Sequence, residues 1–268
     1  MFSTDDFQAW GKDNAILFAA VMTKIEGRKD DALLRTYEFR GFPSMAVLDA
    51  SANAVTKSIP RDLQSMQRIV AATPGYVKLA AAVDAGEDVN ASEWFLARLR
   101  LGKLTSAEAK EQLAEAGLSG DAKEEAQQSM FVLEMTELSK AARRRDASAE
   151  DKMAACEAVY AAFKTGRRLH AGAPPEAFVD DMLIDAAKSN GDKAAFGHAY
   201  ERVKQRHMKR IKDMEGFKAR YEADVEKFKD DEQKRERAKS TVGRIEQIMG
   251  QAEEQLQQLE ALAKKMKS

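Results

Sequence analysis

Proline placement constrains this chain more than any other feature of its sequence. All five prolines, at positions 43, 60, 74, 174 and 175, lie in the first 175 of the 268 residues. Proline removes a backbone donor and its ring clashes with the preceding turn, so it breaks helix interiors. The last 93 residues hold no proline and are therefore expected to be helical with few interruptions.

That proline-free region carries two apolar patterns of the coiled-coil type. The first comprises Ile211, Met214, Tyr221, Val225 and Phe228, and the second Ala238, Ile245, Ile248, Ala252, Leu259, Leu262 and Met266. Both approximate a seven-residue repeat. Between them, KDDEQKRERAK (229–239) has no apolar residue except one alanine. The chain either continues as one long helix or turns here into an antiparallel hairpin. Because no Gly or Pro marks a turn, the sequence favours the continuous helix.

The middle of the chain is predicted to be a series of shorter helices over 76–86, 91–102, 105–117, 120–145, 148–166 and 174–191. Glycines suited to C-terminal caps end most of them: Gly86, Gly102, Gly117, Gly166 and Gly191. Residues suited to N-caps begin several: Ser92, Thr105, Ser106 and Ser148. Short Gly-containing connections at 101–113 and 190–203 are typical of stacked helical hairpins, as in tetratricopeptide arrays. No fixed period near 34 residues accompanies them, so the prediction is an irregular helical repeat.

The first 72 residues mix helix and strand signals. Helices are expected over 3–10, where Gly11 stops the first one, and over 27–39 and 61–72. The continuous apolar run AILFAAVM (15–22) predicts a strand buried on both faces. A Gly-Phe-Pro corner at 41–43 precedes a second strand over 44–50, which is followed by a turn and a short strand over 54–59.

This order of elements resembles the later part of a thioredoxin-like domain. The match runs through YEFRGFPSMAVLDASANAV and rests on Tyr37, Gly41, Pro43, Ser44 in place of threonine, Leu48-Asp49 and Val55. The resemblance implies a cis peptide bond between Phe42 and Pro43. It also implies that Gly41, Phe42 and Pro43 form a peptide-binding site, where the backbone pairs with an extended substrate. The alternative is that this segment only makes the corner before a buried strand.

The redox centre of that family is missing from this sequence. Thioredoxin chemistry needs a Cys-x-x-Cys pair, and the only cysteine here is Cys156. One interpretation is a redox-inactive thioredoxin-like protein, cytoplasmic as the sequence stands. The other is the C-terminal portion of a thiol-disulfide oxidoreductase whose Cys-x-x-Cys segment is absent, which would place the protein in the periplasm or cell envelope.

Charge and hydropathy exclude several classes of partner. With 43 basic and 44 acidic side chains, the chain lacks the basic surplus of a nucleic-acid binder. Arg143, Arg144 and Arg145 follow a long helix, where basic groups favour the negative end of the dipole. No apolar run reaches the length of about 18 residues that a membrane span needs, and the N-terminus MFSTDDFQAW does not look like a secretory signal.

The remaining residues that could take part in chemistry, namely the cysteine, the histidines and the acidic pairs, are expected to have structural roles. Cys156 is expected in a helical core, as are Trp10 and Trp94, and the spacing of His170, His198 and His207 does not suit a helical metal site. The acidic pairs Asp30-Asp31, Asp180-Asp181 and Asp230-Asp231 are expected to be solvated. No phosphate loop, dinucleotide fingerprint or nucleophile elbow is present. No catalytic residue, metal or cofactor is therefore predicted.

Together these patterns predict an α+β chain of three parts. They are a partial thioredoxin-like domain over 1–73, an all-α helical-repeat-like domain over 74–199, and a coiled-coil helix or helical hairpin over 200–268. The expected function is a non-enzymatic protein-binding or assembly scaffold that takes a protein or peptide partner. The coiled coil is a candidate for homo-oligomer formation.

Overall fold

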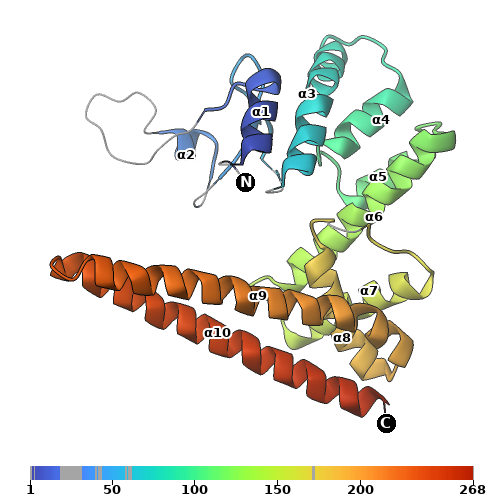
Figure 1. The fold of residues 1–268 in the computed structure, drawn as a ribbon. Helices are drawn as coiled ribbons and strands as arrows, with labels where there is room; N and C mark the ends of the chain where they lie inside the picture. Colours follow the sequence, from blue (N-terminus) through green and yellow to red (C-terminus); the bar gives the residue numbers. More distant parts are fainter. Residues whose placement is uncertain are drawn as a thin grey trace. The chain divides into compact units, whose positions relative to one another are not determined.

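The structure, a computed structural model, describes residues 2, 4–18, 32–39, 41, 44–57, 59, 62–170 and 173–267. It is mostly helical and divides into two compact units, the first ending at Glu134 and the second beginning at Met135. The division falls within α6 (Gly120–Ala142), which contributes to both units (Figure 1).

The first unit begins with α1 (Asp5–Asn14), which buries Phe7 between the rings of Phe2 and Trp10. The expected helix end at Gly11 is wrong, because Gly11 is buried within α1 and the helix continues to Asn14. The predicted strand over 15–22 is wrong at 15–18, which have no regular structure and expose Ile16, Leu17 and Phe18; residues 19–22 lie outside the described part. A continuous apolar strand needs neighbours on both faces, and the described residues pair no strand with this segment. Of the helix expected over 27–39, the structure describes α2 (Leu33–Thr36).

The two strands predicted after the corner form a short antiparallel hairpin. β1 (Val47–Leu48) pairs with β2 (Ala54–Thr56), with Val47 opposite Thr56. In the connecting turn, Asp49 Oδ1 accepts hydrogen bonds from the backbone N–H groups of Ser51 and Asn53, at 2.9 and 2.8 Å. An aspartate that bonds its own following backbone is a common turn device. β1 and β2 form the two-stranded sheet that is present among the described residues. A thioredoxin-like domain around this sheet stays a prediction.

The helix that follows the hairpin is longer than predicted. α3 (Leu63–Asp84) continues through Pro74, so the expected boundary between residues 73 and 74 lies inside one helix. Asp62 caps its start by accepting from the Ser65 N–H at 2.7 Å. Val55 of the hairpin, Ile69 of α3 and Leu101 are buried in one cluster, with Tyr76 and Val77 packed against it. These contacts on both sides of Pro74 explain why packing overrides its cost in the helix.

Three further helices complete the first unit: α4 (Ala91–Arg100), α5 (Ser106–Gln112) and the first part of α6. Their shared core includes Phe95, Leu99, Leu104, Ala109, Ala116, Ala126 and Met130. Thr105 and Glu108 form the capping box at the start of α5, as Thr105 predicts. The N-cap predicted at Ser92 is wrong: Asn90 caps α4, and the Ser92 hydroxyl donates to the Ala116 carbonyl instead.

Trp94 is half-buried on α4 and stacks on the ring of Tyr76 from α3, with 5.6 Å between the ring centroids. Arg98 lies over the outer face of the indole at 4.9 Å. The ring therefore joins α3 to α4, and its open face is covered by a cation.

The second unit contains α7 (Ala149–Lys164) and α8 (Glu176–Asn190), packed against each other and against the first turns of α9 (Lys193–Lys227). Ser148 and Asp151 form a capping box, as predicted for Ser148. The five glycines expected to end helices all have positive φ: Gly86, Gly102, Gly117, Gly166 and Gly191. Such a conformation strains other residues and is typical of a helix C-terminus.

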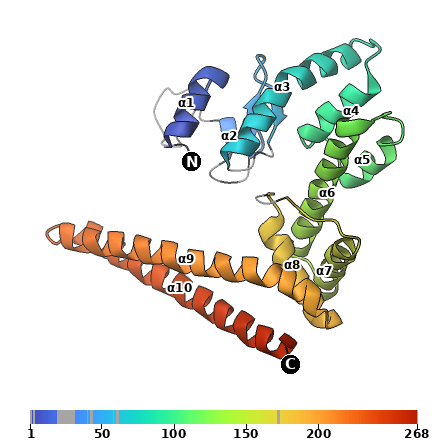
Figure 2. The ribbon, with the colours of Figure 1, turned by 45° about the vertical axis from the view of Figure 1, so that its right-hand side comes forward.

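The end of the chain is an antiparallel helical hairpin. α9 and α10 (Glu232–Lys267) lie side by side in both Figure 1 and Figure 2 and are joined by a turn at 228–231. The preference for one continuous helix is therefore wrong, and the open alternative of a hairpin is confirmed. Folding back lets the two heptad stripes cover each other, which outweighs the high local helix propensity of the turn. The expected boundary between residues 199 and 200 lies inside α9.

Among the described residues, no helix combines the length and the apolar content that crossing a bilayer requires.

Candidate functional site

The predicted peptide-binding corner is described only at its first residue. Gly41 is exposed, and the Ser44 hydroxyl donates to its carbonyl at 2.5 Å. Phe42 and Pro43 lie outside the described residues. Peptide binding at this corner therefore stays a prediction.

Cys156 is buried in α7, as expected. Burial, together with the nearby carboxylates of Asp185 and Glu157, raises the pKa of its thiol to about 11. Since the thiolate is the nucleophile in disulfide exchange, this side chain is protonated and unreactive near neutral pH. The position is suited to packing and not to redox chemistry.

The three histidines occupy different surroundings. His170 is exposed, while burial followed by neighbouring arginines lowers the pKa of His198 and of His207. His198 packs on the ring of Phe163 with 4.9 Å between centroids. Within the described part of the chain, no three His, Cys, Asp or Glu side chains are grouped closely enough to hold a metal ion.

The prediction of solvated acids is wrong for Asp180. Its side chain is 4% exposed and accepts two hydrogen bonds from Arg202, from Nε at 2.9 Å and from Nη2 at 2.5 Å. The adjacent Asp181 pairs with Arg206, one turn further along α9. The spacing of Arg202 and Arg206 by four residues was the sequence signal for this, because it places both on one face of α9. Two ion pairs thus join α8 to the start of α9. The acidic pair Asp30-Asp31, also predicted to be solvated, lies outside the described residues.

In the run Arg143–Arg145 after α6, Arg143 and Arg144 contact other residues of this chain. The guanidinium of Arg143 lies over the ring of Phe178 at 3.6 Å and donates to the Ser139 carbonyl. Arg144 pairs with Asp146 at 2.7 Å. The contact of Arg143 therefore attaches the end of α6 to α8, and the ion pair of Arg144 lies within the connection between α6 and α7.

The most extended candidate surface is the α9–α10 hairpin. On α10 the residues at seven-residue intervals, Ala238, Ile245, Ala252 and Leu259, are buried. On α9 the facing stripe Ile211, Met214, Tyr221, Val225 and Phe228 is only half-buried. Two helices alone cover one stripe of each other, so the remaining sides of these residues stay open.

Two ion pairs align the helices of the hairpin. Lys204 Nζ lies 2.9 Å from Glu260 Oε1, and Lys218 Nζ lies 2.7 Å from Glu246 Oε1. The two lysines are separated by two heptads, and so are the two glutamates. Both lysines stand in the heptad positions that Ile211 and Val225 also occupy. A charged residue in such a position costs stability but specifies the register.

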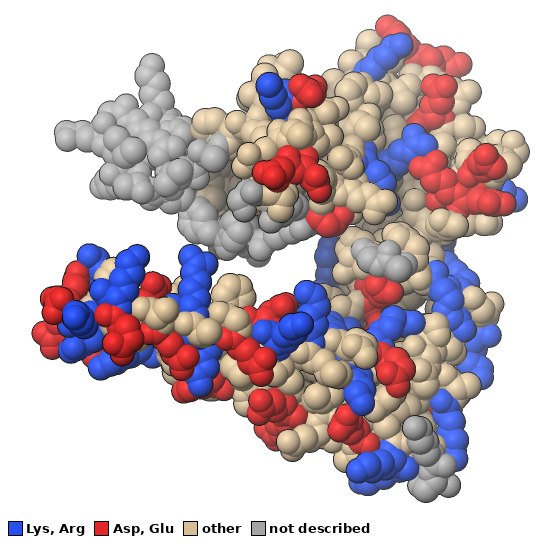
Figure 3. All heavy atoms as spheres, in the orientation of Figure 1, with Lys and Arg blue, Asp and Glu red and all other residues tan. Residues whose placement is uncertain are grey.

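Charge is also segregated along each helix of the hairpin. In α9, residues 202–212 contain six basic side chains and no acidic one, whereas 213–226 are mainly acidic. In α10, residues 234–244 are mainly basic, whereas 245–263 contain Glu246, Glu253, Glu254 and Glu260 and no Lys or Arg. The antiparallel fold therefore sets the basic half of each helix beside the acidic half of the other. Figure 3 shows both signs interspersed over the outer part of the hairpin.

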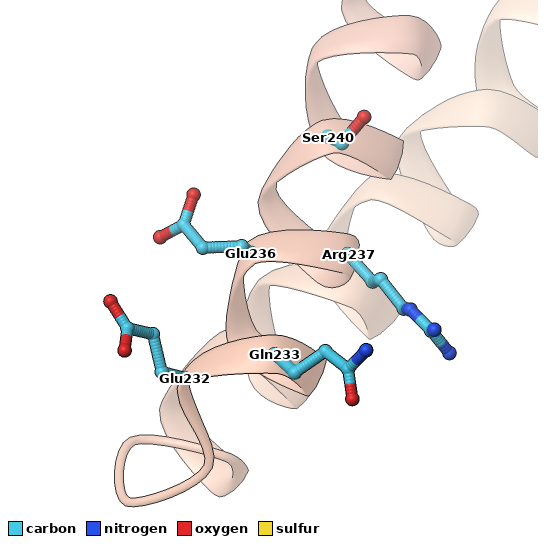
Figure 4. A pocket seen from close by; sticks show the side chains of 5 residues that line it. All are labelled: Glu232, Gln233, Glu236, Arg237 and Ser240. Carbon is cyan, nitrogen blue, oxygen red and sulfur yellow. The ribbon is translucent and has the colours of Figure 1, made fainter.

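A shallow hollow lies at the start of α10. Its lining consists of Glu232, Gln233, Glu236, Arg237 and Ser240, all from this one helix. In Figure 4 the two glutamates point to one side and Gln233 and Arg237 to the other. Side chains that diverge from a single helix do not converge on a ligand, so this hollow lacks the enclosed form of a small-molecule site.

A comparison with family models, with curated proteins and with solved structures finds no match in any of the three.

Proposed function

We propose that this chain is a protein-binding scaffold and that the α9–α10 hairpin is the element that holds its partners. The proposal rests on the way in which burial of the apolar side chains decreases along α9. Phe196, Ala199 and Val203 are buried near α8, yet the heptad pattern continues to Phe228 with half-buried residues. Apolar side chains kept at regular spacing beyond the core are typical of surfaces that another helix covers.

Isolated exposed residues on the same helix support this assignment. Met208 is 45% exposed and Phe217 is 48% exposed, both on the part of α9 that extends past Val203. Met is adaptable and aromatic rings provide large contact areas, so both residue types are frequent in protein interfaces. Each is set among charged neighbours that would form a polar rim.

The test compares two exposed methionines in the full chain. Met208→Glu alters the hairpin, whereas Met153→Glu alters α7, where Met153 is 42% exposed. Proteins bound to the wild-type chain are identified by cross-linking and mass spectrometry. We expect a specific protein, either another chain or a second copy, to be lost with Met208→Glu and retained with Met153→Glu.

Equal binding by both variants would place the interaction elsewhere, and no specific cross-link with the wild-type chain would reject a binding scaffold. Circular dichroism of each variant checks that the helices are intact.

A further inference from the structure

The contact between α7 and the start of α9 places a histidine among arginines. His198 of α9 is half-buried, and its imidazole packs on the ring of Phe163 from α7, with 4.9 Å between the ring centroids. The guanidinium of Arg168, from the connection after α7, lies 3.6 Å from the centroid of the same ring. Arg202 follows His198 by four positions, so the two lie on one face of α9. His198 is thus close to two permanent positive charges.

Both arginines are held by other groups of the chain. Arg168 Nη1 donates to the carbonyl oxygens of Phe163 and Arg167, at 2.7 and 2.8 Å. Arg202 donates two hydrogen bonds to the buried carboxylate of Asp180. Asp180 is therefore already used by Arg202, and the aromatic ring that could stabilise a charged imidazole already carries a guanidinium.

The elements that meet at this contact contribute charged residues from α7, the connection after it, α8 and α9. They include Lys164, Arg167, Arg168, Glu176, Asp180, Asp192, Glu201 and Arg202. Lys164 pairs with Asp192, and Glu176 acts on Arg202 together with Asp180. Glu201 is exposed, so solvent screens its attraction for His198.

These surroundings disfavour a charged imidazole. Burial, followed by Arg202 and Arg168, lowers the pKa of His198, and Asp180 opposes them as the smallest of these influences. The neutral imidazole fits this contact, whereas a proton would add a third positive charge beside two arginines. Histidine is the side chain that ordinarily changes its charge between pH 5 and 8.

We propose that His198 makes the contact between α7 and α9 sensitive to pH, so that mild acidification loosens the α9–α10 hairpin where it joins α7. Because the fold favours the neutral form, the stabilisation from this contact is complete above the unfolded pKa of about 6.5 and is lost as pH falls below it. The proposal concerns the attachment of the hairpin, so it is independent of which partner the hairpin binds.

The first test follows the imidazole signals of the full chain by NMR from about pH 8 to about pH 5. His198→Gln, His207→Gln and His170→Gln assign the three signals. We expect His198 to titrate at a lower pH than the exposed His170. Arg168→Gln should move the midpoint of His198 to higher pH and leave that of His207 unchanged. Arg210→Gln is the matched control, because Arg210 acts on His207, and it should move the midpoint of His207 alone.

The second test measures the loosening itself by hydrogen exchange in the last turn of α7 and the first turns of α9. Wild type and His198→Gln are compared with each other at the same pH. Near pH 7.5 the variant should exchange faster, because it lacks the contact with Phe163, and near pH 5.5 the two rates should converge.

A midpoint of His198 at or above that of His170 would overturn the proposal, as would a midpoint that Arg168→Gln does not move. A difference in exchange between wild type and His198→Gln that is the same at both pH values would also overturn it, since the contact would then be structural and independent of the proton.

Discussion

The two halves of α9 are stabilised in different ways, although they belong to one uninterrupted helix. Its first turns bury Ala195, Phe196, Ala199 and Val203 and are joined to α8 by the ion pair of Asp180 with Arg202. Its later turns have half-buried seam residues and exposed ion pairs with α10. α9 is thus held by a packed core at one end and by a two-helix seam at the other. The same substitution in the two halves should therefore change the free energy of unfolding by different amounts.

The largest expected effect comes from removing the buried carboxylate. Asp180→Ala leaves Arg202 without its partner, and we expect the free energy of unfolding to fall by about 3 kcal/mol. That value is at the lower end of the range for buried pairs because the Arg202 side chain is 39% exposed. Urea unfolding measures it. Asp181→Ala is the control, with an expected loss below about 1 kcal/mol, since Asp181 is 53% exposed.

A matched pair of valines compares the halves directly. Val203 is 4% exposed, whereas Val225 is half-buried in the hairpin. Val203→Ala removes two buried methyl groups and should cost about 2 kcal/mol, and Val225→Ala about 1 kcal/mol. Urea unfolding of both variants measures the difference. Equal losses would show that the hairpin seam is as well packed as the junction with α8.

The acid sensitivity of α9 should arise at its start. Hydrogen bonds from the Ala195 N–H, Lys164 and Tyr160 lower the pKa of Asp192, which caps the helix. Because the folded pKa lies below the unfolded value of about 3.9, the stabilisation is complete above that pH and is lost as pH falls below it. Asp192→Asn should cost about 1 kcal/mol at pH 7 and progressively less below pH 4.

Unfolding of wild type and variant at a series of pH values measures this difference. A difference between wild type and Asp192→Asn that stays constant with pH would assign the cap to hydrogen bonding alone, without a contribution from charge.

The smallest effect is expected at the ion pairs of the hairpin. Lys218 and Glu246 are 31% and 54% exposed, so solvent screens their attraction and Lys218→Glu should destabilise the hairpin less than any of the substitutions above. Exchanging both charges, in Lys218→Glu with Glu246→Lys, should recover most of that loss. Thermal unfolding at low and high salt measures it, and an effect independent of salt would contradict an electrostatic origin.

Local signals in the sequence determined most helix ends. Glycines marked helix C-termini because only a residue without a side chain adopts positive φ freely, and Thr105 and Ser148 marked N-termini because their side chains satisfy free backbone donors. The heptad spacing of the last 60 or so residues likewise follows from the chain alone. These features depend on a few neighbouring residues, which is why they could be predicted.

Tertiary structure decided the rest, because it depends on which distant surfaces meet. The turn at 228–231 has no Gly or Pro. Asp231 caps the start of α10 by accepting from the Lys234 N–H, but the chain folds back because α10 covers the stripe of α9. Asp180 is buried only because Arg202 arrives from another helix. Pro74 stays within α3 because residues on both sides of it pack in one cluster. The apolar run at 15–18 is exposed because no described strand pairs with it. The sequence by itself thus determined the helices and most of their ends, and long-range packing determined which helix surfaces meet.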